Sequence, residues 1–458
     1  MIDGIQLLRL VLACVLIVMI TACTRIDMTP STTSDGTSVA VVSIGTIEPV
    51  ATAAEQLLPS PTTTQPSPLP TATGTTQVPE PTQPALTVDV RRQIFQEVWS
   101  IVDKNYLYAD FGGVDWAAIR REFEPRIAQA TSDEAFYQLI ELMVDRLNDH
   151  HSRFMPPQLA QRQDVLSSGR EEQVGIGVIT LDRGDGLLLR HVFPDSPAAR
   201  AGLRPRDRIV SINGIFYTNT SLQGPEGSEV RLTVVRPGEK SRDIVLNRAN
   251  VEGKITPLAR RLADDIGYIA ITTLWVSDMD VQVSRALADI SAARPLRGLI
   301  LDLRSNPGGW RTVLTGILSH FTSGEVGMFT SRQGNTALRI PTAAQTNLHG
   351  LPLVVLVDGG TASYAELIAA VLQDRAGATV IGVPTVGNTE TIYSYELTGG
   401  ARLWVAQEGF LLPDGRNLEG VGVAPDLQVS DDWTRFSESD DPAIRSALGL
   451  LIPHAGGR

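Results

Sequence analysis

Short apolar segments that alternate with helical segments in the second half of the chain constrain its fold most. Leu299–Leu303 and Leu353–Val357 are almost wholly apolar, and segments of helical composition occur at Asp280–Ala293 and Ala362–Gln373. Strands that are apolar on both faces belong to parallel sheets, whose strands are joined by helices that cover those faces. Residues 253–432 are therefore predicted to form an α/β core with a mostly parallel sheet.

The N-terminus has the pattern of an export signal. An apolar run from Leu10 to Ile20 follows Arg9, and it is shorter than the roughly 20 residues that a membrane-spanning helix needs. The phrase Ile20-Thr21-Ala22-Cys23 resembles the lipobox of bacterial lipoproteins, in which the cysteine is acylated. The resemblance implies a signal peptide over residues 1–23, lipidation at Cys23, and an extracytoplasmic protein anchored to a bacterial cell membrane. The alternative is an ordinary signal peptide in which the cysteine occurs by chance.

A tract rich in threonine, proline and serine follows the signal. Residues 24–87 include phrases such as Pro59–Thr64 and Pro66–Pro70. A segment of this composition cannot bury enough apolar surface to offset the entropy lost on ordering. We therefore expect a disordered tether between the membrane anchor and the folded body.

Charge and cysteine usage exclude several classes of function. The net charge of −12 argues against nucleic acid as a partner, since nucleic-acid binding needs basic surfaces. Both cysteines, Cys14 and Cys23, lie in the predicted signal, so the body has no disulfide, thiol nucleophile or thiolate metal site. The sequence also lacks the local histidine and carboxylate spacing of metal sites. We expect no metal and no cofactor.

Residues 88–165 are predicted to form a helical domain. Val90, Ile94 and Val98 follow the i, i+4 spacing of a helix, and a second helix begins at Ser132, which precedes two carboxylates that suit a helix N-terminus. The segment Leu147–Phe154 follows this helix and contains two histidines and a carboxylate. Packing alone does not require that combination.

Residues 170–252 change to short strands and turns. Their successive phrases resemble, in order, those of a PDZ domain of the bacterial protease type; they are Gly175-Ile176-Gly177-Val178, Leu187–Val192, Asp195–Leu203, Asp207–Gly214 and Val230–Arg236. The resemblance implies that backbone N–H groups of Gly175, Ile176, Gly177 and Val178 receive a peptide carboxylate. The interval from Gly214 to Gly224 holds only about two helical turns, so we expect one groove wall to be short. Whether the groove captures peptides is left open.

Two junctions between a strand and a loop carry the candidate chemistry. In Asp302–Gly309 paired glycines follow a strand, so that backbone N–H groups can converge on a developing oxyanion. In Asp358–Glu366 paired glycines precede Ser363 at the start of a helix, beside free helix N–H donors. The alternatives are a plain turn at the first junction and an ordinary helix-start serine at the second.

The two junctions together, behind the PDZ phrases, resemble the C-terminal processing peptidases, also called tail-specific proteases. The family's further elements match Leu147–Ser152 and Gly422–Asp426. The resemblance implies a multidomain α+β chain with a crotonase-like peptidase core, a protein or peptide substrate, and Ser363 as nucleophile. It also implies that the amide of Tyr364 and that of Gly308 or Gly309 are oxyanion donors. Residues 433–458 are interpreted as a C-terminal tail.

One departure from this family concerns the catalytic base. Processing-type members pair the serine with a lysine in a Gly-Lys-Gly phrase, and the corresponding phrase here places Asn388 at the lysine position. The chain's lysines are Lys104, Lys240 and Lys254, so none follows the serine. Arginine is too basic to replace lysine as a base. A serine–lysine dyad is therefore excluded on this alignment.

Two explanations remain for the missing lysine. The related tricorn-type proteases use a histidine and a carboxylate with serine, and the resemblance implies His151 as base, with Glu390 or Glu419 orienting it and Asn388 as a hydrogen-bonding group. The sequence then encodes an exported, membrane-anchored serine endopeptidase. In the second explanation the site has decayed, and the chain is a tethered module that binds peptides or proteins. The oligomeric state is left open.

Overall fold

The computed structural model describes residues 85–217, 221–342 and 346–452. The predicted signal peptide, Cys23 and the tether up to residue 84 lie outside the described residues. Among the helices that are described, none is both long enough and apolar enough to cross a membrane.

A mostly parallel sheet forms the core, as the apolar segments predict. Its strand order is β10-β11-β12-β15-β16-β19, and every neighbouring pair is parallel except β10 with β11. The bounds are β10 (Leu258–Arg261), β11 (Ile266–Ala270), β12 (Gly298–Asp302), β15 (Leu353–Val357), β16 (Thr379–Gly382) and β19 (Leu427–Gln428). The loops after β12 and β15 leave the same edge of this sheet.

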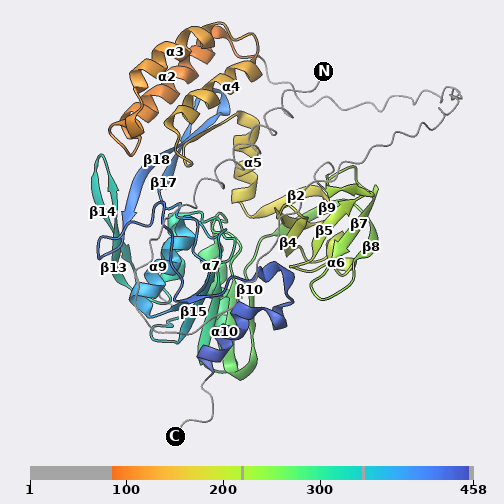
Figure 1. Ribbon diagram of the computed structural model, residues 1–458. Coiled ribbons are helices and arrows are strands. Elements are labelled where there is room, and N and C mark those ends of the chain that lie inside the picture. The colour runs from red at the N-terminus through yellow and green to blue at the C-terminus, as the bar shows by residue number, and fades with distance from the viewer. Residues whose placement is uncertain (1–84, 218–220, 343–345, 453–458) are drawn as a thin grey trace, which may run out of the picture. The chain divides into compact units, whose positions relative to one another are not determined.

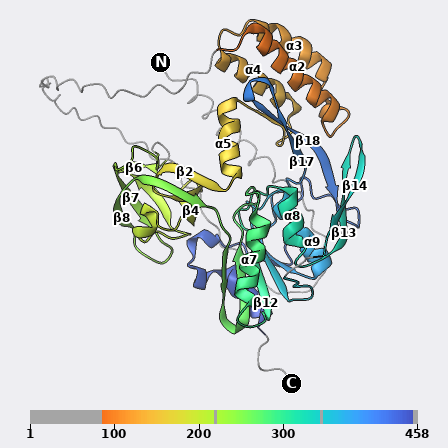
Figure 2. The same ribbon diagram turned by 180° about the vertical axis from the view of Figure 1, so that it is seen from behind.

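Helices cover both faces of this sheet because successive strand residues point to opposite sides. Leu299 and Leu301 of β12 pack with the helices α7 (Met279–Ser291), α8 (Arg311–Leu318) and α9 (Tyr364–Ala376), which Figure 2 shows next to one another. Ile300, between them, packs with α10 (Pro442–Leu451) on the other face. The segment interpreted as a tail thus contributes a core helix, preceded by η6 (Trp433–Arg435) and η7 (Glu438–Asp440).

A second, antiparallel sheet stands beside the core and was not expected from the sequence. Its longest strand, β18 (Arg402–Leu411), pairs with three others: β1 (Arg153–Met155), β13 (Gly324–Ser331) and β17 (Thr391–Glu396). Strand β14 (Gly334–Ile340) pairs with β13. Strand β1 directly follows the segment with two histidines, so this sheet brings that segment to the peptidase core.

The helical region packs on the N-terminal half of β18 (Figure 1). Its α-helices are α2 (Val88–Asn105), α3 (Trp116–Ala128), α4 (Asp133–Val144) and α5 (Pro157–Ser167), with short turns η1 (Phe111–Gly113) and η2 (Asp145–Leu147). The expected helix starts are confirmed, and the Ser132 hydroxyl accepts the N–H of Ala135 as a cap. Helix α3 was not predicted. Leu403 and Val405 of β18 belong to the same apolar cluster as α2, α3 and α4.

The PDZ-like region has the strands that its phrases predict. They are β2 (Arg170–Gly175), β3 (Val178–Asp182), β4 (Leu187–Val192), β5 (Arg208–Ile212), β6 (Ile215–Phe216), β7 (Glu229–Val235), β8 (Arg242–Asn247) and β9 (Ala249–Lys254), with the short helix α6 (Pro197–Arg200). Between β6 and β7, none of the described residues is α-helical. Ahead of β7, Arg248 donates to the carbonyl groups of Ser221 and Leu222. Two further short 3₁₀ turns lie in the described residues, η4 (Ala263–Asp265) and η5 (Thr398–Gly400).

Candidate active site

Ser363 lies at the N-terminus of α9 in a strained backbone conformation. Its φ of 56° and ψ of −131° are unusual for a residue with a side chain, and such a conformation costs about 1–3 kcal/mol. The serine N–H donates to Glu366 Oε2 at 2.9 Å, and Glu366 is completely buried. The strain is therefore maintained by a carboxylate one helical turn away, at a position where a nucleophile is expected.

Glu366 also fixes the loop that holds the position of the missing lysine. Its Oε1 accepts the N–H of Gly387 at 2.7 Å, and its Oε2 accepts the N–H of Asn388 at 2.9 Å. The Thr385 hydroxyl donates to the same carboxylate. One buried side chain thus sets the relative positions of Ser363 and Asn388. The sequence motif contains this glutamate, but sequence reasoning gave it no role.

The two glycine junctions meet at Ser363. The Ala362 N–H donates to the carbonyl oxygen of Asn306, and a Cβ on Gly308 would lie 2.6 Å from the Cβ of Ser363. The N–H of Gly308 already donates to Asn306 Oδ1 at 2.9 Å. Gly309 and Tyr364 both line the cavity in front of the serine. The first N–H of a helix has no partner within the helix, so the Tyr364 amide suits an oxyanion donor.

His151 is buried between two carboxylates. Its side chain is 7% exposed, and its Nε2 lies 3.0 Å from Glu419 Oε1 and 3.7 Å from Glu390 Oε2. Asp149 shapes the preceding turn by accepting the N–H of His151 and the hydroxyl of Ser152. Of the two glutamates that sequence reasoning left open, Glu419 is the one within hydrogen-bond distance.

The carboxylates set the charge of this cluster. Burial alone lowers the pKa of His151, but the hydrogen bond with Glu419 and the charges of both glutamates outweigh it and hold that pKa above its usual value. Although burial opposes it, the hydrogen bond with His151 keeps the pKa of Glu419 low. Burial raises the pKa of Glu390. Tyr108 donates its hydroxyl hydrogen to Glu390, and no sequence motif indicated this tyrosine.

A cavity of about 640 Å³ joins these groups. His151, Ser363, Asn388 and Glu390 all line it, as does His150. Its apolar wall is built from aromatic side chains in edge-to-face contact; they are Trp275, Trp310 and Trp404. Among the described residues, no hydrogen bond joins Ser363 to His151. The cavity therefore brings nucleophile and predicted base to one site without placing them in contact.

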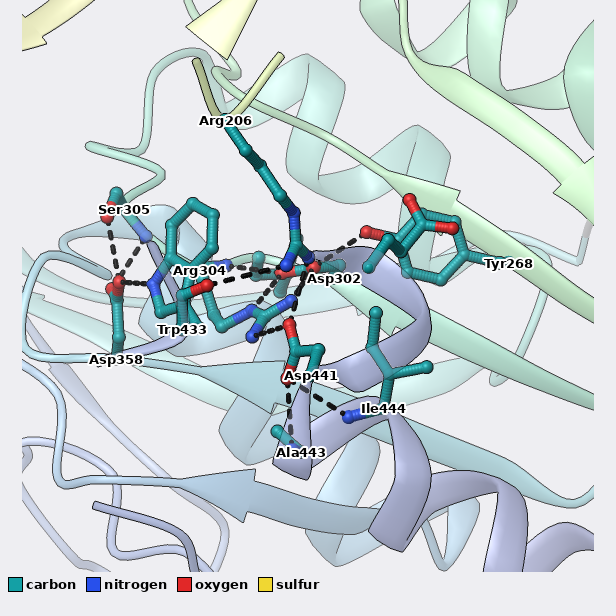
Figure 3. A network of polar contacts seen from close by, with 12 residues as sticks. Arg206, Tyr268, Asp302, Arg304, Ser305, Asp358, Trp433, Asp441, Ala443 and Ile444 are labelled. Carbon is teal, nitrogen blue, oxygen red and sulfur yellow. Dashed lines mark hydrogen bonds and ion pairs between the residues drawn. The ribbon is translucent and has the colours of Figure 1, made fainter. Parts of the chain in front are cut away.

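A buried polar network connects the PDZ-like region with both junctions (Figure 3). Arg206 donates to Asp441 at 2.9 Å, and the same oxygen accepts from Arg304 in the first junction. Burial favours the neutral form of Asp302, yet the guanidinium of Arg304 lowers the pKa of Asp302 to about 2.

The indole of Trp433 is the second link in this network. Arg206 and Arg304 both stack on it, and its N–H donates to Asp358, which starts the second junction. Asp358 in turn accepts the N–H and the hydroxyl of Ser305 in the first junction. The network therefore ties the two loops around Ser363 to each other and to the PDZ-like region.

The predicted carboxylate loop of the PDZ-like region is packed against α6. The carbonyl oxygens of Ile176 and Gly177 accept N–H groups of Ala198 and Phe193. Gly177 has a φ of +80°, and a Cβ there would lie 2.3 Å from the Cβ of Ser196. Together with Gly175 and Val178 it joins β2 to β3. The loop is closely packed at Gly177, while its binding of peptides stays a prediction.

Comparison with known proteins places this geometry in a family. The model of peptidase family S41 matches residues 265–429, the tricorn protease C1 domain matches 88–145, and a PDZ domain matches 191–236. The chloroplastic carboxyl-terminal-processing peptidase 2 of Arabidopsis thaliana is 30% identical over 394 residues, which cover 78% of this chain and 74% of the relative. The chain belongs to peptidase family S41. This confirms the predicted resemblance, and the family is one of serine-type hydrolases.

Other relatives extend the match along most of the chain. The carboxyl-terminal-processing protease of Synechocystis is 28% identical, with 81% of this chain and 89% of the relative covered. Among solved structures, the photosystem II D1 C-terminal processing protease aligns with a TM-score of 0.52 at 24% identity, covering 75% of this chain and 94% of that one. A putative S41 protease from Bacteroides fragilis gives 0.55 at 16% identity, covering 78% and 96%. These structures confirm the predicted fold.

This S41 chain has no lysine at its candidate site. Lys104 lies in the last turn of α2, Lys240 lies between β7 and β8, and Lys254 pairs with Asp278. None of the described residues that line the cavity is a lysine. The backbone N–H of Asn388 donates to Glu366. Asn388 also lines the cavity, as its alignment with the lysine position predicts.

Three side chains of the site have the chemistry of metal ligands. One ligand atom each from His151, Glu390 and Glu419 lies within 4.8 Å of the other two. They come from segments far apart in the sequence, so no local spacing could have indicated the cluster. The expectation that no metal is bound stays untested.

Proposed function

We propose that this chain is an exported serine endopeptidase that cleaves protein or peptide substrates through an acyl-enzyme on Ser363, with His151 as its base. The observation that carries the proposal is the pairing of a buried histidine with Glu419 in the cavity of Ser363, where no lysine is available. A neutral imidazole accepts a proton near neutral pH, which an ordinary lysine does not.

The mechanism follows from the positions of these groups. Ser363 Oγ attacks the substrate carbonyl carbon and its proton passes to His151, whose Nε2 is engaged with Glu419 so that Nδ1 receives it. The N–H groups of Tyr364 and Gly309 stabilise the oxyanion. The imidazolium, stabilised by Glu419, then protonates the leaving amine. Water, activated by the same imidazole, hydrolyses the acyl-enzyme.

Asn388 has a supporting role in this proposal. Its backbone is fixed by Glu366 and its side chain reaches the cavity, where an amide group can donate to and accept from a bound peptide backbone. The side chain has no charge to lose or gain, so it takes no part in the proton transfer itself.

A covalent labelling experiment tests the proposal. The purified chain is treated with a fluorophosphonate, and the modified peptide is identified by mass spectrometry. We expect a single label at Ser363 that is absent in Ser363→Ala and in heat-unfolded protein, because only the folded site activates the hydroxyl. A folded protein that never labels at Ser363 would contradict the proposal.

Asn388 at the lysine position favours a second function, a binding module on a decayed peptidase fold. In that case Asn388→Lys is the informative variant, since it restores the residue that processing-type members use as a base. Activity in Asn388→Lys together with an inert parent chain would favour the binding module.

We further propose that the protein is held at a bacterial membrane through acylated Cys23. The lipobox-like phrase and the tract that follows it support this location. Expressed full-length protein should sediment with membranes, and Cys23→Ala should be released or remain unprocessed. Unchanged membrane association of Cys23→Ala would overturn the anchor.

A further inference from the structure

The cluster around His151 has the composition of a zinc site. An imidazole nitrogen and two carboxylate oxygens converge from the segment before β1, the residue before β17 and the loop after β18. Zinc is bound in proteins by such nitrogen and oxygen atoms, whereas calcium and magnesium take oxygen ligands in larger number. A mixed set of three ligands therefore suits a zinc-like ion.

The distances match the requirements of zinc. Bonds of about 2.0–2.1 Å in a tetrahedron place the ligand atoms roughly 3.3 Å from one another. His151 Nε2 lies 3.0 Å from Glu419 Oε1 and 3.7 Å from Glu390 Oε2. Both separations are within half an ångström of the tetrahedral value, and the two carboxylate oxygens lie within 4.8 Å of each other. Side-chain rotations that close this third separation complete the geometry for an ion.

Glu390 supplies an independent indication of a cation site. The residue is 5% exposed, and Tyr108 donates to its Oε1. Its Oε2 is buried and accepts no hydrogen bond from any residue that the structure describes, although it points at His151. An unsatisfied buried acceptor costs about 1–3 kcal/mol, and a bound cation would remove that cost.

The other two ligands are already oriented by their neighbours. Glu419 Oε2 accepts the N–H groups of Thr389 and Glu390, which leaves Oε1 facing the imidazole. Asp149 holds the backbone of His151. Outer contacts of this kind fix ligand geometry in metal sites.

We propose that His151, Glu390 and Glu419 form an inhibitory site for Zn²⁺, with a water as the fourth ligand on the cavity side. The inhibition rests on the proposed function. A neutral imidazole has one nitrogen with a lone pair and one with a hydrogen, and zinc coordination uses the lone pair. The metal-bound His151 therefore has no nitrogen that accepts the serine proton, and acylation of Ser363 stops.

Binding is measured on the full chain with Ser363→Ala, so that the result does not depend on activity. Zinc is titrated into chelator-treated protein against a chromogenic zinc indicator, and Co²⁺ absorption reports the coordination geometry. We expect one site per chain, with the affinity lowered at least tenfold by Glu390→Gln and by Glu419→Gln. The exposed His349→Ala is the control and should bind as the parent does. Equal affinity in all variants would overturn the site.

The inhibitory effect is measured on the chain with its serine intact. Zinc should slow fluorophosphonate labelling of Ser363 with the same saturation as binding, and a chelator should restore it. Labelling that requires zinc would overturn the inhibitory role. A chain that binds zinc through the two glutamates but is never labelled at Ser363, with or without zinc, would refute the proposed function. The cation site would then still stand.

Discussion

Glycine at position 308 is required by the contact between the two junctions. Its φ is +84°, and a side chain there would press on the Cβ and Oγ of Ser363 and on the carbonyl oxygen of Ala362. Gly359, in the other junction, has open space around its Cα and no such φ, which makes it a matched control.

We predict that Gly308→Ala slows labelling of Ser363 by about 10²-fold or more, because displaced oxyanion donors cost this much. Gly359→Ala should label at nearly the parent rate. Labelling kinetics check the effect, and circular dichroism confirms that both variants fold. Parent-like labelling of Gly308→Ala would show that the close contact with the serine is unimportant.

The charge around His151 predicts the pH dependence of activity. The base acts only when it is neutral, so the rate should fall as the pH falls through the pKa of His151. That pKa is raised, so the inflection should lie above the usual value of about 6.5. Because the charge of Glu390 contributes to this increase, Glu390→Gln should move the inflection to lower pH.

The pH–rate profile of kcat/KM checks this prediction. Glu325→Gln, which removes an exposed glutamate paired with Arg339, serves as control and should leave the inflection in place. An inflection of the parent chain well below pH 6 would mean that this histidine is not the titrating base.

At the scale of elements, the sequence predicted those parts whose patterns are local. The strands β12, β15 and β16 follow from continuous apolar runs, and the α4 cap follows from Ser132. The second sheet was missed because β18 is buried along most of its length without alternation and pairs with strands far away in the chain. The choice between Glu390 and Glu419 as the partner of His151 stayed open for the same reason, since only the tertiary fold brings Glu419 within hydrogen-bond distance of the imidazole.

The short groove wall expected for the PDZ-like region leads to a prediction about peptide binding. Arg248 donates to the carbonyl groups of Ser221 and Leu222 ahead of β7, and a short wall would deprive a bound peptide of contacts on that side. We predict that the full chain with Ser363→Ala binds C-terminal peptides only weakly, with Kd well above about 1 μM. Fluorescence polarisation with free and amidated peptides measures this. Micromolar binding that needs the free carboxylate would show that the shortened wall is sufficient.

At the scale of the whole described chain, the Arg206–Asp441 contact is the link whose energy can be measured. Both side chains are largely buried, and Asp441 also accepts from Arg304. The sequence did not indicate this network, because its members come from the PDZ-like region, the first junction and the segment interpreted as a tail.

A double-mutant cycle of Arg206→Ala and Asp441→Asn should give a coupling of about 0.5–3 kcal/mol in the free energy of unfolding. Denaturant titration measures each term. Arg200→Ala, on the exposed end of α6, is the control and should show no coupling with Asp441→Asn. Additive effects of Arg206→Ala and Asp441→Asn would mean that the contact contributes no coupling free energy between the two regions.

The assignment of His151 as the base in place of lysine is tested most directly by its removal. We predict that His151→Ala lowers kcat/KM for an unstructured protein substrate by about 10³-fold or more at neutral pH, because an unassisted serine is a poor nucleophile. His150→Ala, the adjacent histidine outside the carboxylate pair, should stay within a few-fold of the parent chain. Full activity in His151→Ala would contradict the account and make His150 the next candidate for the base.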